Sequence, residues 1–116
     1  MEIKLPIYTK LYSLSLDIFS LTTNFNKEHK YSSGEKLKTY SIKTLEYVAL
    51  TLHDDNKIEN IKKCRKNLEK IRILIRILKD LKQISLNNFI SLNEKIEEIS
   101  KQMTGWMNSV KKQTST

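Results

Sequence analysis

The strongest constraint on the fold is a regular apolar spacing within the stretch at positions 57–83. Six apolar side chains recur there at intervals of three and four residues: Ile61, Cys64, Leu68, Ile71, Ile75 and Leu78. Because an α-helix has about 3.6 residues per turn, this spacing places all six along one face. Strict alternation of three and four is typical of helices that pack nearly parallel or antiparallel. The stretch therefore predicts a long helix packed lengthwise in a bundle.

Three further stretches have apolar residues at helical spacing, so the chain contains four predicted amphipathic helices. We expect these helices at about residues 6–25, 34–53, 57–83 and 86–112. The connections are short and polar, as at positions 26–31, and Ser85 is a suitable N-cap for the last helix. Two Gly and one Pro are few for the tight turns of an all-β fold. The sequence predicts one all-α domain over residues 1–112, an antiparallel up-down four-helix bundle, with a disordered tail at 113–116.

Positive charge is concentrated in the same stretch. Positions 57–83 hold ten basic and three acidic side chains, a net +7 of the formal +8 of the 116-residue chain. Such a concentration favours an anionic partner, although many basic proteins use their charge only for solubility. A helical projection places Arg65, Arg72, Arg76 and Lys79 on one side of the apolar face, and Lys63, Lys66 and Lys70 on the other. Together with Lys62, these are the candidate anion-binding residues, because like charges one turn apart repel and need a compensating partner.

Ile73 and Ile77 project roughly opposite the apolar face of the same helix. A pair of exposed β-branched residues one turn apart indicates a protein contact more than a single exposed residue does. Self-association through Ile73 and Ile77 is one interpretation. The other is that this helix is buried more deeply within its own bundle.

Residues for catalysis or metal binding are nearly absent from the sequence. Cys64 is the only cysteine, so neither an intramolecular disulfide nor a cysteine-based zinc site can form. His53 precedes Asp54 and Asp55, but this cluster is more typical of helix capping than of a metal site. No phosphate-binding glycine loop or nucleophile motif is present. We therefore expect no enzyme activity, no metal or other cofactor and no small-molecule substrate.

A cytoplasmic location without membrane association is the simplest reading of the sequence. Basic side chains interrupt the most apolar stretch, so it falls short of the roughly 18 apolar residues of a membrane span. The apolar faces of the predicted helices are needed for the bundle, which argues against a membrane-surface helix.

Gly105 and Trp106 stand together late in the last predicted helix. Gly costs about 1 kcal/mol of helix propensity relative to Ala, so we expect a compensating interaction. Close approach of another helix beside the Trp106 ring is the expected compensation, in preference to base stacking by that ring.

Two motifs of the C-terminal half resemble those of a known family. Positions 68–81, LEKIRILIRILKDL, resemble the run L-x-x-L-R-x-x-L-R-L-x-x-D-L of Avd, the accessory variability protein of diversity-generating retroelements. Positions 96–109, IEEISKQMTGWMNS, resemble that family's ending L-x-E-I-G-R-x-L-G-G-W-x-x-S, and positions 33–37 match its L-G-[DE]-[KR]-[IL] pattern. The resemblance covers roughly residues 7–110. Three positions depart from the family pattern, where Pro, Gly and Gly are usual: Asn26, Ser100 and Thr104.

The resemblance implies a homopentameric barrel of four-helix bundles that binds a reverse transcriptase and nucleic acid. It further implies a role in error-prone cDNA synthesis from template RNA during mutagenic retrohoming, for an intracellular protein that is bacterial, archaeal or phage-encoded. Arg72, Arg76 and Lys101 match basic positions of the motifs, whereas the other cations are candidates on charge alone. Two alternatives stay open: a four-helix protein encoded in a ribosomal-RNA intervening sequence, and a structural bundle that binds no nucleic acid.

Overall fold

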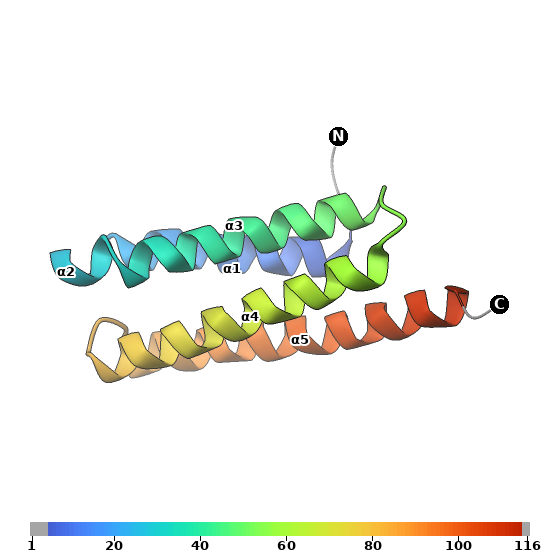
Figure 1. The fold of residues 1–116 in the computed structure, drawn as a ribbon. Helices are drawn as coiled ribbons and strands as arrows, with labels where there is room; N and C mark the ends of the chain where they lie inside the picture. Colours follow the sequence, from blue (N-terminus) through green and yellow to red (C-terminus); the bar gives the residue numbers. More distant parts are fainter. Residues whose placement is uncertain (1–4, 115–116) are drawn as a thin grey trace.

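Four long helices form the protein in the computed structural model, which describes residues 5–114. They are α1 (Pro6–Thr22), α3 (Ser33–Thr51), α4 (Lys57–Asp80) and α5 (Leu86–Thr114), and a single turn, α2 (Lys27–Lys30), precedes α3. Successive long helices run in opposite directions, with α1 and α3 forming one layer and α4 and α5 the other (Figure 1). Helix α1 packs against α3 and α5, and α4 packs against the same two helices. Residues 5–114 contain no strand, so the predicted up-down four-helix architecture is confirmed.

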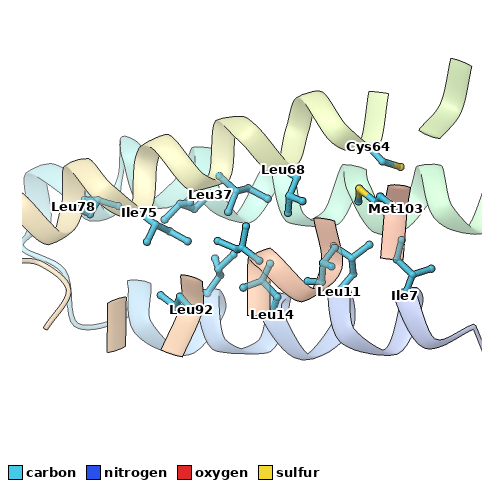
Figure 2. Packing of buried hydrophobic residues seen from close by; sticks show 14 of the residues in the cluster. Ile7, Leu11, Leu14, Leu37, Cys64, Leu68, Ile75, Leu78, Leu92 and Met103 are labelled. Atoms are coloured by element: carbon cyan, nitrogen blue, oxygen red, sulfur yellow. The ribbon is translucent and has the colours of Figure 1, made fainter. Parts of the chain in front are cut away.

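The predicted apolar face of α4 lies at the centre of the core. All six of its side chains are at most 2% exposed. Figure 2 shows Leu68 and Ile75 on the side of α4 that faces α1 and α5. The other helices surround the α4 face with further buried side chains: Ile7, Leu11, Leu14 and Ile18 of α1, Leu37 and Val48 of α3, and Leu92, Ile96, Ile99 and Met103 of α5. The three-and-four spacing therefore identified the buried face of α4 correctly.

Small polar side chains line much of the face of α3 that packs in the bundle. Ser41, Thr44 and Thr51 are buried, and each hydroxyl donates to a carbonyl oxygen three or four residues earlier in the same helix. Burial of a hydroxyl is costly unless it has such a partner. Their small size lets α4 pack closely, and the Cys64 Sγ lies 3.8 Å from the Thr44 carbonyl oxygen.

The ends of several helices differ from the predicted ends. Positions 26–31 are not simply a polar connection, because Lys27–Lys30 form a helical turn, and Gln113 and Thr114 belong to α5 instead of a disordered tail. Positions 115–116 of the predicted tail lie outside the described residues. Helix α4 ends at Asp80, three residues early, because Lys82 adopts the left-handed conformation with φ 63°. The Ser85 cap is confirmed, since its Oγ accepts from the Asn88 N–H at 3.1 Å.

The Lys82 turn has the hydrogen bonds of a Schellman motif. The Gln83 N–H donates to the Leu78 carbonyl at 2.8 Å, and the Lys82 N–H donates to the Lys79 carbonyl at 3.0 Å. The Gln83 side chain then accepts from the Asn26 N–H at 2.7 Å, which joins the α1–α2 and α4–α5 connections at one end of the bundle. Asn26 stands where the family usually has Pro, and Pro has no N–H to donate. The departure from the family pattern therefore supplies a hydrogen bond in this chain.

Candidate anion-binding surfaces

The cations of α4 lie on both sides of its buried face, as the projection predicted. The arginine row, which we define as Arg65, Arg72, Arg76 and Lys79, lies on the side of α5. The lysine row, Lys63, Lys66 and Lys70, lies on the side of α3. The two rows have different partners in the structure.

Most of the arginine row is engaged within the bundle. The guanidinium of Arg65 donates to the Thr104 Oγ1 at 2.9 and 3.0 Å. Thr104 is one of the departures from the family pattern, and a glycine there would leave Arg65 without this acceptor.

Arg72 and Lys79 also find their partners within the chain. The guanidinium of Arg72 pairs with Glu97 of α5, and its Nε lies 3.3 Å from the Glu69 Oε1. The Lys79 Nζ lies 2.9 Å from the Asp80 Oδ1 and 4.8 Å from the centre of the Phe89 ring. The hydrogen bond from Lys79 is the largest cause of the lowered pKa of Asp80. Three of the four cations in this row therefore stabilise contacts of α4 with itself or with α5.

Arg76 and Lys101, two of the motif-matched cations, are exposed on the α4–α5 side. Arg76 lines a hollow of about 360 Å³ together with Arg72, Ile73, Phe89, Asn93 and Glu97. Lys101 lines a second hollow that also contains Glu94, Glu97 and Glu98. Neither cation has an ion pair or hydrogen bond within residues 5–114. Their surroundings include several carboxylates, so the potential of this side is mixed.

The lysine row is free of acidic partners. Lys63 and Lys70 place their Nζ atoms 5.6 and 5.2 Å from the ring centres of Tyr47 and Tyr40 of α3, respectively. None of the three lysines forms an ion pair within the described region. The acids of α4 pair elsewhere, and Glu59 lies 3.8 Å from Lys62. This row therefore leaves its positive charge available to a partner outside the chain.

Ile73 and Ile77 are exposed in the single chain, at 58% and 44%. The alternative of deeper burial within the bundle is therefore wrong. A second exposed apolar strip, which the apolar spacing did not predict, runs along α1 and includes one residue of α3. Its members are Tyr12, Leu16, Phe19 and Ile42. Because the Lys38 Nζ of α3 lies 5.7 Å from the Phe19 ring, this strip borders the α1–α3 contact.

The expected close approach at Gly105 is wrong. A Cβ at this position would meet no atom of another helix within 4 Å, so no helix approaches Gly105 closely. Trp106 is half-buried and packs against the edge of the core, as a structural residue should. The two residues border an apolar hollow of about 290 Å³, which Leu5, Pro6, Ile7 and Gln102 also line.

The remaining polar candidates have structural partners. Burial raises the pKa of the Cys64 thiol to about 12. Asp54 accepts from the Asn56 N–H at 2.9 Å and from the Asn60 side chain at 3.1 Å, and these hydrogen bonds lower its pKa. Within residues 5–114, no three His, Cys, Asp or Glu side chains are grouped as a metal site would require. No helix of this region has the length and hydropathy needed to cross a membrane.

Fold and surface together define a class of protein, a small up-down helical bundle with its charge concentrated on one helix. Comparison with protein families specifies this class further. The chain belongs to the bAvd-like family, whose model matches residues 5–110. This match confirms the resemblance found in the two C-terminal motifs, and it relates the chain to Avd-type accessory proteins, a family with no catalytic role. Comparison with curated proteins gives no match.

Proposed function

We propose that the protein is a non-catalytic accessory factor of a diversity-generating retroelement. In this role it binds the reverse transcriptase and nucleic acid, either template RNA or cDNA, and supports mutagenic retrohoming. Family membership supports the accessory role. The observation that carries the nucleic-acid part is the row of exposed lysines on α4, none of which pairs with an acid of residues 5–114.

Phosphate contacts explain how such a surface would bind. Lysine ammonium groups neutralise phosphates and release counterions, which gives affinity without sequence preference. If the three lysines of this row contact a duplex, the slope of log affinity against log salt is about −2.7, from roughly −0.9 per contact. A fourfold rise in salt then lowers the affinity by a factor of about 40.

Binding can be measured by fluorescence anisotropy with a labelled 20-nucleotide RNA and a 20-base-pair duplex, at 50 and 200 mM salt. We expect binding at the lower salt concentration and a loss of affinity of at least tenfold at the higher one. If the wild-type protein binds neither probe at 50 mM salt, the nucleic-acid part of the proposal is wrong and a purely structural bundle is favoured.

Self-association is the second part of the proposal. A cyclic pentamer requires two different surfaces that meet at each interface. Ile73 and Ile77 on α4 offer one such surface, and the exposed strip on α1 and α3 offers the other. A pentamer would have a mass of about 68 kDa, five times 13.7 kDa.

Light scattering of the wild type and of an Ile73→Asp/Ile77→Asp variant tests this part. We expect the wild type at the pentamer mass and the variant at a lower mass, because buried carboxylates are costly at an interface. Leu50→Asp is the matched control, since Leu50 is 58% exposed near the opposite end of the bundle. A wild type that is monomeric at micromolar concentration would refute the pentamer.

A further inference from the structure

The outer edge of the α3–α4 contact is lined by lysines from both helices. On α3, the residues Lys36, Tyr40, Lys43 and Tyr47 follow one another at intervals of four, three and four, which places them on one face. On α4, the lysine row follows intervals of three and four. Two contacts join these faces, since Lys70 lies over the Tyr40 ring and Lys63 over the Tyr47 ring. The two helices lie side by side and antiparallel (Figure 1).

The lysine groove is our name for the surface formed by Lys36, Lys43, Lys63, Lys66 and Lys70, and this surface is positive and uncompensated. All five side chains are exposed, and none has an ion pair within the described region. Helix α3 has two acids, and Glu35 pairs with Lys38 at 2.8 Å. The other, Glu46, lies one turn from Lys43 without pairing to it. The charge of Lys63 is the smallest of the causes that act on the pKa of Asp54.

The state of the two tyrosines restricts what this groove can bind. Tyr40 and Tyr47 are half-buried, and lysine ammonium groups lie over their rings. Proteins that bind single strands usually stack bases on free aromatic faces. A duplex instead presents phosphates outward and keeps its bases stacked inside, so point charges suffice for binding. Because Lys70 lies over Tyr40 and Lys63 over Tyr47, the groove runs along α3 from Lys36 to the level of Tyr47, a length of about 16 Å. Duplex DNA has one charge per about 1.7 Å of its axis.

We infer that the lysine groove between α3 and α4 binds the phosphate backbone of a nucleic-acid duplex, whereas the arginine row serves mainly the α4–α5 contact. This inference rests on the proposed function, in that it assigns the nucleic-acid partner to one face of the bundle. It also changes the residues involved. Lys36 and Lys43 enter the site, and the motif-matched cations Arg72, Arg76 and Lys101 leave it.

Two triple variants with the same loss of charge test the assignment. The groove variant is Lys36→Gln/Lys43→Gln/Lys66→Gln, which spares the two lysines that cover tyrosine rings. The control variant is Arg76→Gln/Lys82→Gln/Lys101→Gln, whose three cations are exposed outside the groove. Far-UV circular dichroism and thermal melts establish that both variants fold. Anisotropy titrations then use a 20-base-pair duplex and one of its single strands over 50–200 mM salt.

The groove variant should lower the magnitude of the duplex salt slope by about 2.7 for each contacting subunit, from roughly 0.9 per lysine. The control variant should retain the wild-type slope to within about one unit. Equal losses in both variants, or a loss confined to the control, would overturn the groove assignment while the proposed function stands. Tighter wild-type binding of the single strand than of the duplex would also overturn it. Wild-type binding of neither probe would refute the nucleic-acid part of the proposed function itself.

Discussion

Three isoleucines of α4 provide an internal test of which side of this helix faces the core. Ile75 is fully buried, whereas Ile73 and Ile77, two residues away on either side, are largely exposed. The same substitution to Ala can therefore be made at buried and exposed positions of one helix turn. Truncation of a buried Ile to Ala costs about 2–5 kcal/mol, from lost transfer energy and the remaining cavity. Truncation of the exposed Ile73 should cost less than about 0.5 kcal/mol, partly because Ala has the higher helix propensity.

Urea denaturation followed by far-UV circular dichroism measures the difference. With a slope of about 1.5 kcal/mol per M, a loss of about 3 kcal/mol for Ile75→Ala lowers the midpoint by about 2 M. Ile73→Ala should leave the midpoint within about 0.3 M of the wild type. Because self-association adds stability that depends on concentration, the comparison is made at the lowest usable concentration and repeated at a tenfold higher one. Equal midpoint shifts for the two variants at low concentration would show that the assigned buried face is wrong.

Three further predictions concern Lys82 in the turn after α4, the buried thiol of Cys64, and Asp54 in the connection between α3 and α4. Lys82→Gly should stabilise the protein by about 1 kcal/mol relative to Lys82→Ala in the same urea assay, because φ 63° is strained for a residue with a Cβ. The Cys64 thiol, with a pKa of about 12, should not react with a disulfide reagent at pH 8 until the protein is unfolded. Asp54→Asn should lower stability at pH 7 but not at pH 2. The lowered pKa of Asp54 means that its carboxylate stabilises the fold above the usual pKa of 3.8 and that this contribution disappears as the pH falls through the folded value.

Helix α4 could be predicted more fully than α3 for a physical reason. Every buried position of the α4 face has an apolar side chain, except for two flanking asparagines, Asn60 and Asn67. On α3, half of the buried positions are Ser or Thr, whose hydroxyls bond within their own helix. Once its hydroxyl has a hydrogen-bond partner, a Ser or Thr can be buried as readily as a small apolar residue. It does not, however, contribute to the apolar pattern of the sequence. A search for apolar periodicity therefore underestimates the contact between α3 and α4.

The helix ends were less predictable because the usual signals are missing. The turn after α4 has Lys82 in a position where Gly is usual, so nothing in the local sequence marks the end of the helix. The hydrogen bond between Asn26 and the Gln83 side chain joins residues that are 57 positions apart, and local sequence cannot reveal it.

The charge of the candidate site could be predicted from the sequence, but the residues that its cations contact could not. The projection of α4 alone placed each cation on the correct side of the buried face. It could not show that Glu97 and Thr104 of α5 would engage the arginines, or that tyrosines of α3 would lie beneath two lysines. The regular spacing of Lys36 and Lys43 on α3 was visible in the sequence. Its meaning depended on knowing that this face of α3 meets the lysine row.

The geometry of α4 also bears on the two proposed external contacts of this helix. Lys63, Lys66, Lys70, Ile73 and Ile77 form one stripe at intervals of three and four, which is charged in its first half and apolar in its second. From Lys66 to Ile73 the helix rises about 10 Å, and from Lys63 to Ile77 about 21 Å. Substitutions this far apart with no shared partner usually act additively. The proposed duplex binding by the lysines and the proposed subunit contact by the isoleucines are therefore separable by substitution, and the buried face behind them holds both sets of side chains in place.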